Sequence, residues 1–226
     1  MILTAHQPAY LPWLGYFEKI MRSDVYIYMD TVQLEKGSFT TRNKIKTANG
    51  ATWLTVPVIT KGHMESRILD LNMNDKVKWQ KKHFLSIQYA YKNAPYYDEF
   101  INKIAPFYEK EYSNFADFCF EYTKFWLSEL NIDTKIVRMK DIEVSGAKSD
   151  LVLSMCKTMN ADTFISGAMG KDYMDEEKFA ANGIKIVYQD YKPREYPQLW
   201  GEFIPCMGII DFVMNTKDYS LITGGK

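Results

Sequence analysis

The sequence predicts an α/β protein with a mainly parallel sheet flanked by helices, an antiparallel hairpin insert and a helical segment. Short β-rich runs alternate with helical patterns near both ends of the chain, as in a parallel, helix-flanked sheet. A two-residue turn signal separates two β-rich runs within residues 38–71, and residues 75–130 carry apolar residues at helical spacing. The 226 residues can bury a full core, and we expect one domain over residues 1–226.

A strand, a helix and a second strand are expected at the start of the chain. Residues 1–5 form a short apolar run, and residues 25–29 form a second β-rich run that ends at Asp30. Between these runs, Pro12 suits a first helical turn, and apolar side chains recur at helical spacing through Arg22.

The insert after the second strand is predicted to be an antiparallel hairpin. Asn49-Gly50 lies between the runs 44–47 and 52–56, and this dipeptide is a strong hairpin turn signal. Residues 67–71 are expected to add an edge strand, so the insert spans about residues 38–71.

Three helices are predicted next. They cover about residues 75–91, residues 97–111 with a bend or break at Pro106, and a third stretch that starts near Ser113. Aromatic residues make up 15% of the chain, and several of them recur here at helical spacing and are expected to be core: Trp79, Tyr91, Phe118, Tyr122 and Phe125.

Alternation returns in the last third of the chain. The predicted strands are residues 134–139, 162–165 and 184–188, and the predicted helices are residues 149–159 and 175–181. This order favours a parallel sheet with helical crossovers.

Composition excludes several classes of protein. Lys and Arg total 28 and so do Asp and Glu, which argues against a nucleic-acid scaffold role. The three cysteines are far apart, so neither a disulfide framework nor a metal knuckle is predicted, and we expect no metal site. No apolar run is long enough to span a membrane and the first residues lack a signal-peptide pattern, so we expect a cytoplasmic protein without a membrane span.

Candidate site residues follow from the rule that ligands bind at the carboxyl ends of parallel strands. The rule selects these polar positions: His6, Gln7, Asp30, Gln33, Ser166, Gly167, Gln189 and Asp190. His6 can act as an acid, a base or a donor to phosphate, or it can simply hydrogen-bond a neighbouring loop. His63 and His83 are expected to be structural or surface residues.

Three further features carry candidate residues. Arg42, Lys44 and Lys46 alternate with Asn43 on the predicted hairpin and share a face, which suits phosphate but is also typical of a solvated strand. The turn 166–170 contains two glycines that let backbone amides approach a ligand, although it lacks the spacing of a known phosphate loop.

Asp211 lies within an apolar stretch at residues 209–213. A carboxylate there is either poised for chemistry with a shifted pKa, or it caps a helix or belongs to a buried ion pair.

The run His6-Gln7-Pro8-Ala9-Tyr10-Leu11-Pro12-Trp13-Leu14-Gly15-Tyr16-Phe17 resembles the signature of the WbqC-like protein family. Further segments similar to that family are Arg42-Asn43-Lys44-Ile45-Lys46, Ile165-Ser166-Gly167 with Gly170 and Tyr173, and Tyr196 with Gln198. The resemblance spans nearly the whole chain and implies a role in O-antigen or other surface-glycan biosynthesis, with glycine transfer to an amino sugar as the implied activity.

A second, weaker resemblance concerns the fold. A strand that ends in a histidine and proline turn before a helix is similar to the opening of HIGH-type nucleotidyltransferases. Gly15-Tyr16 stands where those enzymes carry their second histidine, which argues against their phosphate chemistry.

Three functional hypotheses follow. The first is an aminoacyl transferase that acts on a nucleotide-linked amino sugar and takes an amino-acyl donor, with His6, Asp30 and Asp211 as catalytic candidates. Its stacking candidates are Tyr10, Trp13, Tyr173 and Tyr196. The second is a nucleotidyltransferase that uses ATP with magnesium, and the third is a non-catalytic nucleotide-sugar binding module. The sequence does not identify the acyl donor or the cofactor, and it is compatible with a homodimer.

Overall fold

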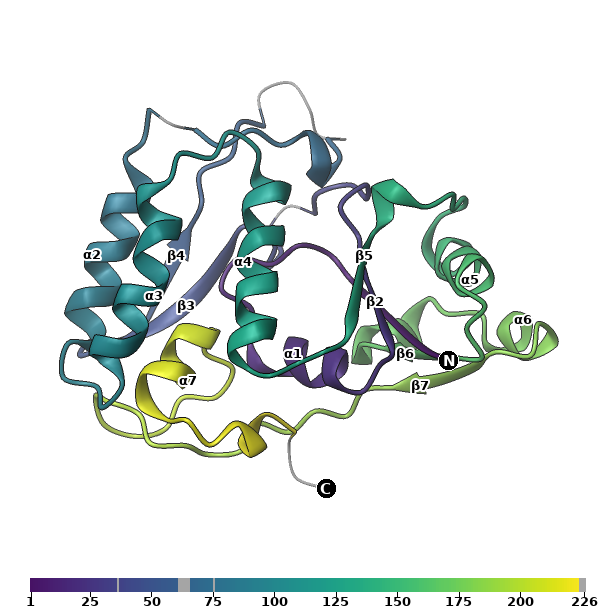
Figure 1. Ribbon diagram of the computed structural model, residues 1–226. Coiled ribbons are helices and arrows are strands. Elements are labelled where there is room, and N and C mark those ends of the chain that lie inside the picture. Colours follow the sequence, from purple (N-terminus) through teal and green to yellow (C-terminus); the bar gives the residue numbers. More distant parts are fainter. Residues whose placement is uncertain (36, 61–65, 75, 224–226) are drawn as a thin grey trace.

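The computed structural model has a five-stranded parallel sheet in the order β5-β2-β1-β6-β7 (Figure 1). It describes residues 1–35, 37–60, 66–74 and 76–223. The strands are β1 (Ile2–His6), β2 (Val25–Tyr28), β5 (Lys135–Arg138), β6 (Thr163–Ser166) and β7 (Lys185–Tyr188). The predicted mainly parallel sheet is therefore confirmed.

Helices cover both faces of this sheet because the side chains of each strand alternate between two apolar clusters. Tyr26 and Tyr28 on β2 pack with α1 (Leu14–Met21) and α4 (Phe115–Glu129). Val25 and Ile27 on the same strand pack on the opposite face, where α5 (Lys148–Thr158) and α6 (Glu176–Ala181) lie (Figure 1).

The strand order has one topological switch point, between β1 and β6. The chain proceeds outward from β1 through β2 to β5, then returns to β6 beside β1 and continues outward to β7. In open parallel sheets this is where a crevice opens at the carboxyl ends of the strands. Residues that follow β1 and β6 are therefore brought together.

A long insertion between β2 and β5 holds the predicted hairpin and helices. The hairpin consists of β3 (Arg42–Thr47) and β4 (Gly50–Thr55), which pair antiparallel with Lys44 opposite Trp53. Thr47 pairs with Gly50, so the turn residues are Ala48 and Asn49, one residue earlier than the Asn49-Gly50 turn expected from the sequence. The helices are α2 (Trp79–Tyr91), α3 (Tyr97–Glu109) and α4.

The structure contradicts the expected edge strand at residues 67–71 and a break of the helix at Pro106. Residues 67–71 form no edge strand: Ile68–Asp70 is a 3-10 helix, and Arg67 contributes only an isolated bridge to Gln33. Pro106 does not break α3, which continues to Glu109, because the missing N–H removes one hydrogen bond near the helix end while Lys110 N still donates to Pro106 O at 3.0 Å.

The C-terminal segment crosses back from the sheet to the inserted helices. After β7 the chain runs past the hairpin into α7 (Ile209–Asn215), which contacts α2, α3 and β3. Short 3-10 helices lie at Met139–Asp141, Ala168–Asp172 and Tyr219–Thr223. No helix in the described part of the chain is long and apolar enough to cross a membrane.

Candidate functional site

The switch point places His6 beside the turn that follows β6. His6 is the last residue of β1, and Ser166 is the last residue of β6, the neighbouring strand. The edge-of-sheet rule therefore selected residues from two strands that do lie next to each other. The described residues at this edge offer three groups of polar atoms: the His6 ring, the Gln7 amide and the backbone at Gly167.

The His6 ring is held in a single tautomer. Its Nδ1 lies 2.8 Å from the Gln7 carbonyl oxygen, which can only accept, so Nδ1 carries the proton. Nε2 is then an acceptor, and it has no hydrogen-bond partner among the described residues. The ring also contacts Tyr16 edge-on, with the centroids 5.0 Å apart.

His6 is neutral over the physiological pH range. Burial, and secondarily the Lys19 ammonium, lower the pKa of His6 from 6.5 to about 3. Lys19 is itself buried in α1 and donates to Ala5 O at 2.9 Å, one residue before His6. The site therefore presents a neutral imidazole whose free nitrogen accepts protons or hydrogen bonds.

Gln7 connects this edge to the inserted hairpin. Thr40 Oγ1 donates to Gln7 Oε1 at 3.1 Å, so the amide NH₂ group of Gln7 is left as a donor. Tyr10 N donates to Thr40 O at 2.9 Å, and the side-chain amide of Asn43 donates to Leu11 O at 2.6 Å. The turn after β1 thus runs along the start of the hairpin.

The turn after β6 has one open glycine and one tightly packed glycine. A Cβ on Gly167 would meet no atom within 4 Å, whereas a Cβ on Gly170 would lie 1.9 Å from Ser166 Oγ. Gly170 allows the turn to close on the buried Ser166 side chain, and Gly167 leaves the backbone accessible. Tyr173, which follows this turn, is 46% exposed.

Asp30 is fully buried at the end of β2 and belongs to an ion pair. Arg138 Nε donates to its Oδ2 at 2.6 Å, and Lys140 N donates to its Oδ1 at 3.1 Å. Arg138 also donates to Asp117. These partners come from the β5 side of β2, and no hydrogen bond between described residues joins Asp30 to His6 on β1.

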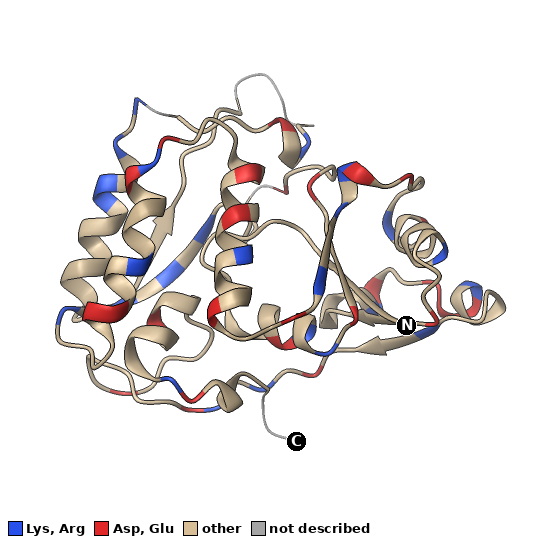
Figure 2. Ribbon diagram, in the orientation of Figure 1, with Lys and Arg blue, Asp and Glu red and all other residues tan. Residues whose placement is uncertain are grey.

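The cations of β3 separate into two environments. Arg42 and Lys44 lie over the Trp53 ring, with Arg42 Cζ 4.5 Å and Lys44 Nζ 4.9 Å from its centroid. Lys46 is 1% exposed, and its Nζ donates to Gln198 Oε1 at 3.1 Å and to the Glu202 carbonyl. Figure 2 shows the positive segments of β3 beside the inserted helices.

Asp211 lies in a buried hydrogen-bond network away from the sheet edge. Tyr91 OH donates to its Oδ1 at 2.8 Å, while Tyr196 OH and Gln198 Nε2 each donate to its Oδ2 at 2.7 Å. Burial raises the pKa of Asp211, and these bonds and Lys46 act in the opposite direction. The network joins α7, α2, β3 and the C-terminal segment.

Other candidates also have structural partners. Gln189 Nε2 donates to Gly15 O at 2.7 Å and to Glu18, which fixes the end of β7 to α1. Tyr10 is fully buried, and its hydroxyl lies 2.9 Å from His83 Nδ1 and 3.0 Å from Tyr108 OH. Gln33 is bridged to Arg67, and His63 lies outside the described residues.

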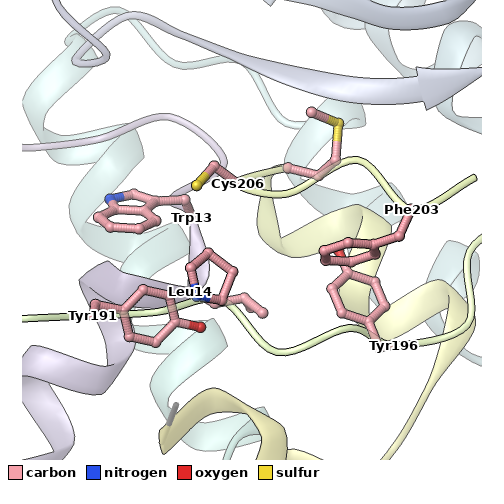
Figure 3. Close-up of a pocket in the computed structure, with 8 residues that line it drawn as sticks. Trp13, Leu14, Tyr191, Tyr196, Phe203 and Cys206 are labelled. Atoms are coloured by element: carbon pink, nitrogen blue, oxygen red, sulfur yellow. The ribbon is translucent and has the colours of Figure 1, made fainter. Parts of the chain in front are cut away.

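Trp13 lines a small pocket on the C-terminal segment, together with Tyr191, Tyr196, Phe203 and Cys206 (Figure 3). The Trp13 and Tyr191 rings meet edge-on with centroids 5.3 Å apart. The Tyr191 hydroxyl is buried and has no hydrogen-bond partner among the described residues. Trp13 and Tyr196 therefore line the same pocket (Figure 3).

Sequence reasoning missed Trp53, Thr40, Lys19 and Arg138. Trp53 and Arg138 carried a usable signal, because Trp53 pairs with Lys44 in the hairpin register and Arg138 ends a strand at the ligand edge. Lys19 and Thr40 carried none, since only the tertiary fold brings them to their partners. Within the described ranges, no group of three or more His, Cys, Asp or Glu side chains could hold a metal ion.

Comparison with known proteins agrees with the signature in the sequence. A model of the WbqC-like protein family matches residues 7–222 of the chain. The protein Rv1507c of Mycobacterium tuberculosis (strain ATCC 25618 / H37Rv), whose name describes it as uncharacterized, is 32% identical over 211 residues, which are 92% of this chain and 91% of that protein. No solved structure matches the chain significantly.

Proposed function

Because this chain belongs to the WbqC-like protein family, we propose that it is an enzyme of surface-polysaccharide biosynthesis. The proposed reaction joins a small amino acid such as glycine to the amino group of a nucleotide-linked sugar. The observation that carries the proposal is the His6 ring at the switch point, with Nδ1 bound to Gln7 O and Nε2 available as an acceptor.

The reaction uses His6 as a proton acceptor. The sugar amine attacks the carbonyl carbon of an activated aminoacyl donor, the new C–N bond forms, and the bond to the donor's leaving group breaks. His6 Nε2 takes the proton released by the amine nitrogen and transfers it to the leaving group. An imidazole with a pKa of about 3 is a weak base, and a negative charge on a substrate group bound beside the ring would raise that pKa.

Neighbouring donors suit the other requirement of acyl transfer. The tetrahedral intermediate carries an oxyanion, which N–H groups at fixed positions stabilise. The Gln7 amide is oriented by Thr40 so that its NH₂ group is available, and the backbone at Gly167 is open to a ligand. Both lie next to strand ends at the switch point, as the proposed reaction requires.

A second candidate, nucleotidyl transfer with ATP and magnesium, is favoured by the strand order and its switch point. The environment of His6 speaks against it. A neutral Nε2 that accepts a hydrogen bond cannot also donate one to a phosphate. Tyr16 stands in place of a second histidine, and its hydroxyl is already hydrogen-bonded to the Tyr26 hydroxyl at 2.6 Å. Pyrophosphate exchange by the purified protein with ATP or CTP would establish this alternative.

Mass spectrometry of surface glycan from a strain lacking the gene tests the proposal. We expect one sugar to lose a small acyl group while the rest of the repeat unit is retained. Loss of the whole sugar would favour nucleotidyl transfer. An unchanged glycan would refute the assignment to this pathway.

A further inference from the structure

Arg42 and Lys44 form a pair of cations without an acidic partner. Both lie over the Trp53 ring, and neither forms an ion pair with any described residue. Several other cations that lie over aromatic rings in the described part of the chain are paired with carboxylates, as Lys103 is with Glu129 and Lys110 with Glu121. The hairpin therefore holds two positive charges together and leaves them uncompensated.

The Arg42 guanidinium has an unsatisfied donor. Its Nη2 donates to Gly37 O at 2.7 Å, which fixes the side chain, while its Nε is buried and has no partner among the described residues. A buried N–H without an acceptor is destabilising, because it has lost its hydrogen bond to water. A bound anion would neutralise the two charges.

Trp53 explains how the two cations stay together. Lys44 is directly opposite Trp53 in the hairpin, and Arg42 is the next residue along on the same face. The negative face of the indole ring attracts each cation. Trp53, which is 40% exposed, thus places the guanidinium and the ammonium side by side at the surface.

We propose that Arg42 and Lys44 clamp a diphosphate, and that Trp53 is the positioning residue that holds the clamp in shape. An arginine fork beside a lysine point charge suits adjacent phosphate groups better than a single carboxylate. This inference rests on the proposed function, in which the diphosphate belongs to the nucleotide-linked sugar. It assigns the diphosphate to Arg42 and Lys44. Lys46, the third phosphate candidate from the sequence, is not part of the clamp, because its Nζ is already hydrogen-bonded to Gln198 and Glu202.

The clamp is tied to the switch point by direct contacts. Thr40, two residues before Arg42, binds both the Gln7 side chain and the Tyr10 N–H. These hydrogen bonds thus hold the start of β3, which carries the clamp, against the turn after β1, which begins next to His6. A sugar diphosphate bound there would place its phosphates on the hairpin and extend its sugar toward His6.

Calorimetric titration of the full chain with inorganic pyrophosphate tests the clamp. We expect saturable one-site binding that Arg42→Met weakens at least tenfold, because charge-assisted hydrogen bonds contribute about 1.5–3 kcal/mol. Trp53→Leu should weaken pyrophosphate binding two- to fivefold relative to the wild type. Trp53→Phe should bind pyrophosphate about as tightly as the wild type, since phenylalanine retains an aromatic face. Lys124→Met is the matched control, because Lys124 also lies over a ring, that of Phe120, but on α4.

Each outcome counts for or against the clamp. Undetectable pyrophosphate binding by the wild-type protein, or equal binding by Trp53→Leu and wild type at matched melting temperatures, would overturn it. If Arg42→Met fails to fold, Lys44→Met provides the same test of affinity. His6→Gln should bind pyrophosphate normally, so loss of acyl transfer with intact pyrophosphate binding separates the two proposals.

Discussion

The hydroxyl of Tyr91 is predicted to stabilise the buried network around Asp211. Tyr91→Phe removes only this oxygen, which donates to Asp211 Oδ1 at 2.8 Å and accepts from Lys46 N at 2.9 Å. A hydrogen bond to a charged group contributes about 1.5–3 kcal/mol, and the orphaned backbone N–H adds about 1–3 kcal/mol. Because the two effects are not fully additive, we expect Tyr91→Phe to lower the free energy of unfolding by about 3 kcal/mol.

Urea unfolding followed by circular dichroism measures this loss. For a chain of this size it corresponds to a decrease in Tm of roughly 6–12 °C. Tyr89→Phe is the matched control, because Tyr89 lies on the same helix, is 70% exposed and makes no hydrogen bond with the described residues. A Tyr91→Phe protein within about 0.5 kcal/mol of the control would refute the interpretation of Asp211 as a buried, stabilising acceptor.

Three further predictions concern the sheet edge. Gly170→Ala should lower the free energy of unfolding, measured in urea, by about 1–3 kcal/mol, because the new Cβ would lie 1.9 Å from Ser166 Oγ. Gly167→Ala should leave this free energy unchanged, and equal losses for the two variants would contradict the packing argument. Lys19→Met should raise the pKa of His6 from about 3, since the ammonium lowers it, and an unchanged pKa in an NMR titration would exclude that coupling. The pKa of His6 is about 3 in the folded protein and 6.5 in the unfolded chain. Between these two pH values the unfolded chain binds more protons than the folded protein. The free energy of unfolding that His6 contributes above pH 6.5 is therefore lost as the pH falls. At pH 5 this loss is about 2 kcal/mol, and His6→Gln should show a shallower dependence of Tm on pH; parallel curves would argue against a buried neutral His6.

The sequence predicted the parts of the fold that depend on local patterns. The alternation of strands and helices, the hairpin and the helical segment could all be identified, because apolar spacing and turn residues report on neighbouring positions. The edge-of-sheet rule also selected His6 and Gly167 for the same edge. Residues 67–71 were misassigned because their β-type residues stand beside polar turn-formers that favour a short 3-10 turn.

The partners of buried polar groups could not be predicted. Asp30 and Arg138 are 108 residues apart, and Tyr91 and Asp211 are 120 residues apart. Residue type and spacing identify a carboxylate that needs a partner but not which of many donors the fold brings to it. For this reason the sequence grouped Asp30 with His6 as a catalytic candidate, whereas in the structure Asp30 pairs with Arg138 on β5.

The role of His6 is tested most directly by complementing the gene-deletion strain with His6→Gln and with His83→Gln. Both substitutions replace a partly or fully buried histidine by an amide, but His83 lies on α2 beside Tyr10. Mass spectrometry of the surface glycan should show the small acyl group absent with His6→Gln and present with His83→Gln and with wild type. An acyl group present at the wild-type level in the His6→Gln strain would contradict the proposed role of His6 as the proton acceptor.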